Sequence, residues 1–483
     1  NPMSTSALSL REKIGYASGD AGCNIIFGTI MLFVSFFYTD VFGLSPAMVG
    51  ILLLSVRILD AVADPIMGII ADRTVSRWGR FRPWLLWGAV PFAIASILMF
   101  TTPDWSYQAK VIYAFATYAL MSMTYTMVNI PYCSLGGVIT NDPVERVACQ
   151  SRRFVMVGVA TLLLTLSLLP MTEWFGGGNK ARGYQSAMVV LSLIGMCLFF
   201  FCFFNVKERI HAAVPSHDAW RKDLRNVWKN DQWIRMLLLT LCNVCPGFIR
   251  MAAVMYYVTR VMQQSAGFAT FFISLGVVGM MIGSMLARPL TDRWCKLKVF
   301  FWTNIVLALF SAGFWFVNPQ AVVLVTCLYF LLNILHQIPS PLHWSLMADV
   351  DDYGEWKTGK RLTGISFSGN IFFLKCGLAI AGALVAFLLS HYGYNASATT
   401  QSPQALAGIV LLFTLIPAFG YLLTAGVVRL LKVDRSLMKQ IQSDLEKRRR
   451  NYSGIADLYR QVKAEHRERQ TITNVRPQIL PGN

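Results

Sequence analysis

The sequence predicts an all-α membrane protein with twelve transmembrane helices arranged in two bundles of six. The chain is 55% hydrophobic and only 14% charged over 483 residues, whereas soluble domains carry about 25% charged residues. Apolar stretches of about 20 residues, the length that crosses a bilayer, recur along the chain. The basic residues lie in short tracts between these stretches, so the net charge of +18 indicates membrane topology rather than a nucleic-acid partner.

The apolar stretches fall into two sets. The longest polar interval before the tail predicts a boundary, with an N-terminal bundle at 1–205, a middle loop at 206–235, a C-terminal bundle at 236–431 and a charged tail at 432–483. The expected helices are 22–38, 46–70, 83–101, 109–135, 154–171 and 185–205 in the first bundle, and 236–259, 265–288, 299–317, 321–348, 364–390 and 405–431 in the second.

The basic tracts predict the orientation of the chain in the membrane. Connections after the even-numbered helices hold most of the Lys and Arg, whereas the odd-numbered connections hold only Lys110, Lys180, Arg182 and Arg260. Because cytoplasmic loops are enriched in basic residues, we expect both termini in the cytoplasm. We do not expect the polar start, through Lys13, to be a cleavable signal peptide. Ten Cys without paired spacing predict neither disulfides nor a zinc site.

A weak internal repeat supports two parallel halves. Asp72-Arg73 follows the second helix, and Asp292-Arg293 follows the equivalent eighth helix. The pattern from Gly68 to Arg73 resembles the loop signature of the major facilitator superfamily. Transporters built from such halves hold their substrate between them, near the middle of the bilayer.

Two acids in the second helix are the strongest functional signal. Arg57, Asp60 and Asp64 are spaced three and four residues apart, so they share one helical face. Charges in a membrane helix must face the bundle interior or a wet cavity, and two neighbouring carboxylates can take up a proton or coordinate a small cation. Lys375 is a candidate partner from the other half. The alternatives are that Arg57 pairs with both acids as a brace, and that Lys375 extends to an interface.

Several motifs together resemble the glycoside-pentoside-hexuronide:cation symporter family, from about residue 10 to the end of the twelfth helix. They are "RILDAVADP", "SRWGRFRPW", "YTMVNIPYCSL", "RRFV" and "MADVDDYGEWKTGKRLTGISFS", with Lys375 after them. The resemblance implies that Asp60, Asp64 and Thr126 bind the coupling cation. Sodium-using members often have Asn before the second acid, where this chain has Ala63. We therefore expect H⁺ as the coupling ion rather than Na⁺ or Li⁺, and no other cofactor.

The resemblance also implies a sugar pocket between the halves. Its two acids are replaced here by Asn24 and Asn129, whereas Arg153 and Tyr125 are retained and Cys133 stands in place of a Trp. Asn can still donate and accept hydrogen bonds to the neutral hydroxyls of a sugar. The stretches "VNIPYC", "GGVITNDP" and "CGLA" resemble members that carry pentosides, so the resemblance favours a pentoside, especially an α-xyloside. The alternative for the two Asn side chains is hydrogen bonding between helices.

Arg250 lies deep in the seventh expected helix, and its charge is relevant to whether the transported sugar is neutral or anionic. A buried guanidinium needs an anion, and its fork suits a carboxylate or sulfonate. One hypothesis is therefore an anionic substrate, a hexuronide or sulfo-sugar. The interpretation we favour is an internal ion pair with Asp20 of the first helix.

Acids and bases near the cytoplasmic ends of the helices are expected to form a gate of ion pairs that open and close between states. Its members are Asp72 with Arg73 and Arg77, and Asp349 and Asp352 with Arg361. His336 and His343 are expected to pack or form hydrogen bonds rather than bind a ligand. The alternative for His343 is that it faces the cavity between the halves.

These features predict a sugar:cation symporter that works by alternating access in the bacterial inner membrane. Its expected partners are a small glycoside and the lipid bilayer, and we expect a monomer. We expect no enzyme activity, because the sequence has no HExxH, no paired Cys/His set and no Gly-rich phosphate loop. A lipid carrier on the same fold is the remaining alternative.

Overall fold

The computed structural model describes residues 8–211, 219–395 and 398–475. Parts of the predicted middle loop (212–218) and tail (476–483) lie outside the described residues. The described chain is all-helical, with loops between the helices. The bounds of the first helices are α1 Leu10–Phe36, α2 Pro46–Asp72, α3 Arg82–Met99, α4 Tyr107–Leu135, α5 Pro143–Gly176, α6 Lys180–Asn205 and α7 Trp220–Trp228. The later helices are α8 Asp231–Tyr256, α9 Ala266–Arg293, α10 Lys296–Gly313, α11 Val322–Gln337, α12 Pro339–Thr358, α13 Thr363–His391, α14 Pro403–Phe413, α15 Leu415–Val428 and α16 Arg435–Val475.

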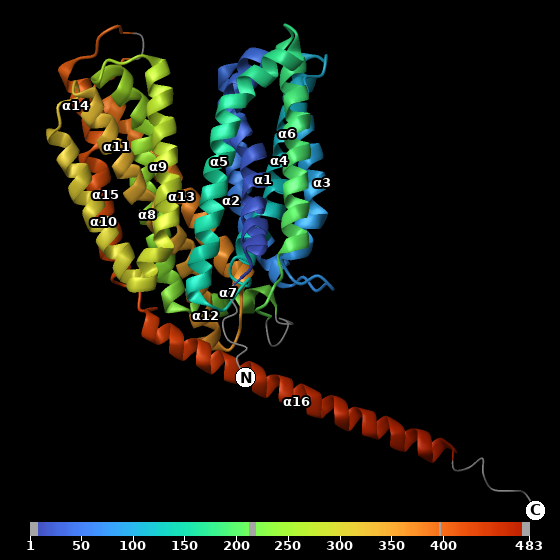
Figure 1. The fold of residues 1–483 in the computed structure, drawn as a ribbon. Coiled ribbons are helices and arrows are strands. Elements are labelled where there is room, and N and C mark those ends of the chain that lie inside the picture. Colours follow the sequence, from blue (N-terminus) through green and yellow to red (C-terminus); the bar gives the residue numbers. More distant parts are fainter. Residues whose placement is uncertain (1–7, 212–218, 396–397, 476–483) are drawn as a thin grey trace, which may run out of the picture.

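Figure 1 shows the long helices in two groups, α1 to α6 on one side and α8 to α15 on the other. The groups diverge toward one end of the molecule and meet at the other, where α7 and α16 lie; we call this second end the α16 end. There α2 packs against α13, and α5 packs against α9 and α12. The contacts that hold the two groups together thus include α2, the helix with the acidic face.

Proline breaks two of the expected helices. The stretch 321–348 forms α11 and α12 with a break at Ile338, next to Pro339. The stretch 405–431 forms α14 and α15 with a break at Thr414, because Pro417 has no N–H for the carbonyl of Phe413 and its ring would contact that carbonyl. The sequence prediction of one continuous helix at each place was wrong for this reason.

Ten helices of the described chain are long and apolar enough to cross a membrane, by length and composition. In that count α11 and α12 form one span and α14 and α15 another. Helices α1 and α2 are not among the ten. The apolar sequence of α2 is interrupted by charged residues, namely Arg57, Asp60, Asp64 and Asp72.

Close packing of α2 on α13 depends on Gly68. A Cβ at this position would lie 2.2 Å from Ser368 Oγ and 2.7 Å from the carbonyl oxygen of Gly364. We predict that Gly68→Ala lowers the stability of this arrangement by about 1–3 kcal/mol, because overpacking at backbone contact forces the helices apart. Thermal unfolding in detergent measures the effect. Gly50→Ala on the same helix is the control, because a Cβ there meets nothing within 4 Å, and a loss no larger than in that control would contradict the prediction.

Candidate functional site

The acidic face of α2 meets residues from both helix groups. Asp64 is fully buried; its Oδ2 lies 2.7 Å from Lys375 Nζ of α13, and its Oδ1 accepts a hydrogen bond from Thr126 Oγ1 of α4 at 3.4 Å. Asp60 is half-buried and accepts a hydrogen bond from Ser122 of α4. The expected contact between Lys375 and this face is therefore present, and it joins the two groups across their interface.

Arg57 does not neutralise both acids as the bracing alternative requires. It is exposed, whereas the recorded ion pair of Asp64 is with Lys375. Thr126 and Ser122 add hydroxyl groups beside the two carboxylates, so the face offers oxygen atoms and proton-accepting groups to a small cation. Within the described residues no group of three or more His, Cys, Asp or Glu side chains forms a metal cluster.

A second charged pair lies on the inner side of the N-terminal group. Arg153 Nε of α5 donates to Asp20 Oδ2 of α1 at 2.7 Å, and both side chains are buried. The predicted pair between Asp20 and Arg250 was therefore wrong. The two residues belong to different helix groups. The sequence did not show that Arg153, about three helical turns from the N-terminus of α5, lies opposite α1.

The other expected sugar-pocket residues lie near the Asp20–Arg153 pair. Asn24 Nδ2 donates to Asp20 Oδ1 at 3.3 Å, and Asn129 Oδ1 accepts a weak hydrogen bond from Cys133 Sγ at 3.7 Å. Tyr125 stacks on the ring of Phe27 with 4.3 Å between centroids. Both Asn side chains are half-buried. The hydrogen bonds recorded for them lie within their own helices, which does not match the alternative that they join neighbouring helices.

Residues of the C-terminal group line a cavity of about 210 Å³ opposite this pair, and among them is Trp344, which sequence reasoning missed. The guanidinium of Arg153 lies 4.4 Å from the ring centroid of Trp344 on α12, which also lines the cavity. His343 lines the same cavity and shares a hydrogen bond with Thr240 Oγ1 at 2.9 Å. Trp344 lies near the start of α12, shortly after the break at Ile338. No periodic pattern in the sequence indicates that its side chain points inward.

A cluster of buried ion pairs joins the helix groups at the α16 end. Arg146 of α5 bonds to Asp349 at 2.8 Å and to Asp352 at 2.6 Å, both on α12. Arg361 bonds to Asp352 at 2.6 Å and donates to the carbonyl of Gly137 at 2.8 Å. Burial alone would lower the pKa of Arg361, but the carboxylates of Asp351, Asp352 and Glu355 raise it, so the side chain stays charged. In the sequence, Arg146 is one of the basic residues in the connections after the even-numbered helices, and nothing there indicates its place in this cluster.

Asp72 of α2 forms a second contact between the helix groups at the α16 end, with the start of α13. Its carboxylate accepts the backbone N–H groups of Gly364 at 2.7 Å and Ile365 at 2.8 Å, at the N-terminus of α13. Its ion-pair partner is Arg80 at 3.8 Å. The expected partners differ: Arg73 bonds to Asp223 of α7 at 3.2 Å. Arg77 stacks on Trp78. A helix N-terminus favours a carboxylate, which accounts for this placement of Asp72.

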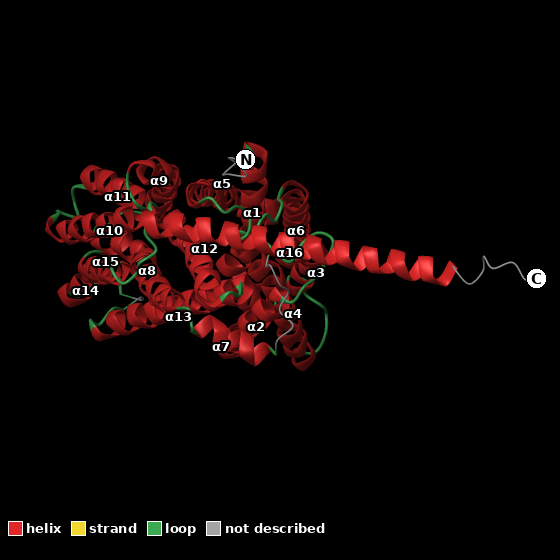
Figure 2. Ribbon diagram, turned by 90° about the horizontal axis from the view of Figure 1, so that it is seen from below, coloured by secondary structure: helices red, strands yellow, loops and turns green. Residues whose placement is uncertain are grey.

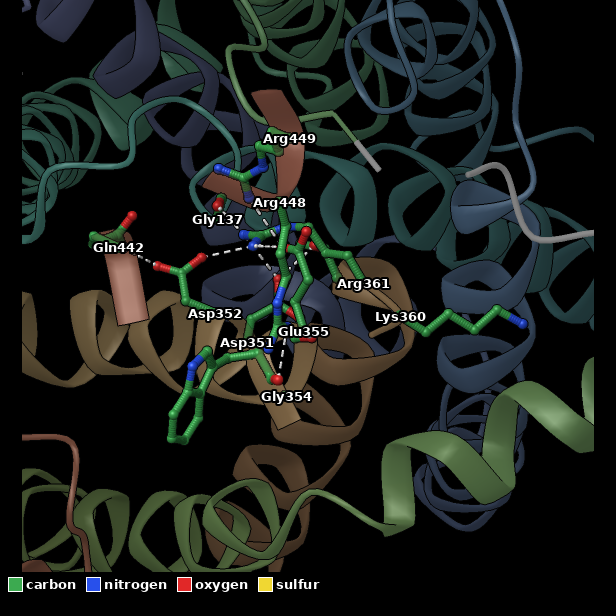
Figure 3. Close-up of polar contacts among 12 residues, drawn as sticks. Gly137, Asp351, Asp352, Gly354, Glu355, Lys360, Arg361, Gln442, Arg448 and Arg449 are labelled. Atoms are coloured by element: carbon green, nitrogen blue, oxygen red, sulfur yellow. Dashed lines mark hydrogen bonds and ion pairs between the residues drawn. The ribbon is translucent and has the colours of Figure 1, made fainter. Parts of the chain in front are cut away.

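The tail helix α16 packs onto this cluster, as Figure 2 shows where α16 crosses α12. In Figure 3, Gln442 and Arg449 of α16 point toward acids of α12. Gln442 Nε2 bonds to Asp352 Oδ2 at 2.6 Å, and Arg449 lies 3.0 Å from Glu355. Trp356 Nε1 in turn donates to Asp444 of α16 at 2.9 Å. The tail therefore contacts the same carboxylates that pair with Arg146 and Arg361.

We predict that replacing both Gln442 and Arg449 by Ala loosens α16 from the cluster. Hydrogen exchange of the amides between residues 438 and 449 should rise about tenfold, since loss of these charged contacts is expected to cost about 1.4 kcal/mol. Arg460→Ala is the control, because its ion pair is exposed and lies within α16. Equal exchange in the double variant and the control would contradict this role of the contacts.

Comparison with known proteins identifies the family. The sequence profile described as MFS/sugar transport protein matches residues 15–435. The chain is 47% identical over 427 residues to the inner membrane symporter YicJ of Escherichia coli, covering 88% of this chain and 92% of that protein. The chain belongs to the MFS sugar transport family, among the glycoside-pentoside-hexuronide:cation symporters.

A second relative and a solved structure support the same family and fold. The isoprimeverose transporter of Lactiplantibacillus pentosus is 32% identical over 454 residues, covering 92% of this chain and 93% of that protein. The crystal structure of the major facilitator superfamily transporter FucP in the outward conformation matches the fold with a TM-score of 0.64 at 13% identity, covering 87% of this chain and 98% of that one. Family membership makes the chain a multi-pass membrane transporter rather than an enzyme.

Proposed function

We propose that the chain carries a glycoside into the cell together with a cation by alternating access in the bacterial inner membrane. Helices α1 and α2 are taken to cross the membrane with the ten apolar spans, which gives twelve crossings in two bundles of six. The α16 end is taken as cytoplasmic, together with both termini. The closed ion-pair cluster at that end then corresponds to a state that is open toward the outside.

The observation that carries the proposal is the buried contact of Asp64 with Lys375 across the two helix groups. A cation on the acidic face would reduce the negative charge of the two carboxylates and weaken the attraction of Asp64 to Lys375. Because this contact joins the groups, cation binding would change how they pack. By linkage, a sugar that favours the same packing binds more tightly when the cation is bound.

For the coupling ion we propose H⁺. The face supplies two carboxylates and two hydroxyl groups, from Ser122 and Thr126, and has Ala63 where a further oxygen ligand would serve Na⁺. Na⁺ needs several oxygen ligands, whereas a proton needs one basic group. For the substrate we propose a pentoside, with its hydroxyl groups at Asp20, Asn24, Asn129 and Arg153.

The test is proton uptake by vesicles that contain the purified protein. Addition of an α-xyloside without any imposed gradient should make the outside medium more alkaline in step with sugar entry. A lipid carrier would give no such signal with any glycoside. Sugar entry without a pH change, but dependent on Na⁺ or Li⁺, would assign the coupling to a metal cation instead.

A further inference from the structure

A buried positive charge in the C-terminal helix group has no recorded acidic partner among the described residues. Arg250 of α8 is 4% exposed. Its guanidinium donates to Tyr421 Oη at 2.8 Å, to Ser311 Oγ at 2.6 Å and to the carbonyl of Phe413 at 3.4 Å. The sequence has no Asp or Glu in 232–291, 293–348 or 356–433. A buried charge without a counter-ion is costly, so an additional reason is needed for an arginine here.

The hydrogen bonds by which Arg250 holds neighbouring helices together explain only in part why an arginine occupies this position. The carbonyl of Phe413 lacks its usual helical donor because Pro417 has no N–H, and Arg250 Nε fills that place. Ser311 and Tyr421 join α10 and α15 to the same side chain. Neutral donors could make all three bonds. The hydrogen bonds thus account for a polar side chain, but not for a charged one.

The charge is connected to the cavity through two further side chains. Arginine has only donors, so Tyr421 Oη accepts from Arg250 and can direct its own proton to His336 Nδ1, 3.0 Å away. His336 then carries its ring proton on Nε2. We call Arg250, Tyr421 and His336 the donor chain. A positive charge at one end of such a chain polarises it and strengthens the donor at the other end.

The free end of the donor chain lies at the cavity of about 210 Å³. His336 and Tyr421 both line it, and so does Gly247, where an added Cβ would lie 2.7 Å from His336 Nε2. Trp344 forms a wall of this cavity and also contacts Arg153 of the proposed sugar pocket. The other polar lining residues include Asn243, Asn304, Ser340 and His343. A ligand in the sugar pocket could therefore extend past Trp344 to the donor chain.

We propose that this cavity is an anion-accepting subsite and that the donor chain selects substrates with a carboxylate. The inference rests on the proposed glycoside transport: the pentose ring occupies the N-terminal pocket, and the linked residue places its carboxylate at His336. Arg250 is a positioning residue in this arrangement, because it acts through Tyr421 and supplies the charge that favours an anion over a neutral hydroxyl.

The experiment compares two disaccharides that differ in one group, xylosyl-glucose and xylosyl-glucuronate, by their affinities for the purified protein. The wild type should bind the glucuronate form at least about tenfold more tightly, as expected for a charged hydrogen bond. Arg250→Gln, which can still donate, and Tyr421→Phe should each reduce this ratio to below about threefold. Gly247→Ala, which displaces the His336 ring without removing Arg250, should do the same.

Two outcomes overturn the inference. One is a wild-type ratio near one, and the other is an unchanged ratio in Arg250→Gln, which would leave the arginine as a brace only. If neither disaccharide binds, the proposed pentoside fails but the subsite is still tested, by thermal stabilisation with glucuronate against glucose. Glucuronate should stabilise the wild type but not Arg250→Gln, and equal effects of the two sugars would reject the subsite.

Discussion

Replacing Asp64 by Asn should abolish accumulation of sugar against its gradient. A membrane potential of 100 mV acting on one co-transported charge supplies about 2.3 kcal/mol, which supports an inside-to-outside ratio of about 50. Asp64→Asn removes the carboxylate that contacts Lys375 and Thr126, so the ratio should fall to about one. Uptake of labelled glycoside by energised vesicles measures it.

Counterflow separates loss of coupling from loss of folding. Sugar exchange without a gradient does not require net cation movement, so Asp64→Asn should keep a measurable exchange rate while accumulation is lost. Asp104→Asn is the matched control, because Asp104 lies exposed between α3 and α4 and should leave both readouts at the wild-type level. Accumulation by Asp64→Asn at the wild-type ratio would remove this residue from the coupling role.

Replacing Arg146 by Gln should open the α16 end. The change leaves Asp349 and Asp352 without the guanidinium that contacts both across the helix groups. Removal of one partner from a buried ion cluster costs about 3–5 kcal/mol, although Lys296 and Arg361 still pair with the two acids. The closed arrangement should therefore lose much of its stability relative to one that is open at this end.

A single cysteine reports this opening. Ser368 is 1% exposed and lies where α13 packs against Gly68, so Ser368→Cys in a chain without other cysteines should react slowly with a polar thiol reagent. Adding Arg146→Gln should raise the rate at least about tenfold. Arg450→Gln, which breaks an exposed pair within α16, should change it less than twofold. A folded Arg146→Gln protein with the slow rate would show that the cluster does not hold this end closed.

Sequence patterns sufficed for most of the long helices and for the spacing of the acidic face, because hydropathy and three- to four-residue spacing are local properties. They also suggested Lys375, since a lone lysine in an apolar helix needs a partner. They did not predict the two breaks, at Ile338 and Thr414. The same reasoning failed for Asp20, Arg73 and Arg77. The partner of each was fixed by how distant helices pack, and several acids and bases were available within a similar reach.

The missed residues share a further feature. The position of Trp344 depends on the break near Pro339. The ion pairs of Arg146 form because α5 packs against α12. An aromatic residue in an apolar helix, or an arginine at a basic helix end, is ordinary in a membrane protein. Their importance becomes visible only when the two helix groups are placed against each other.

The central claim is that cation occupancy of the acidic face changes the affinity for sugar. Its most direct test is the affinity of the purified protein for one glycoside, measured from pH 5 to pH 9 with and without Na⁺ and Li⁺. We predict that affinity falls as the pH rises, that Asp64→Asn removes this dependence, and that the alkali ions have little effect. An affinity that is the same at every pH and in every salt would contradict the claim.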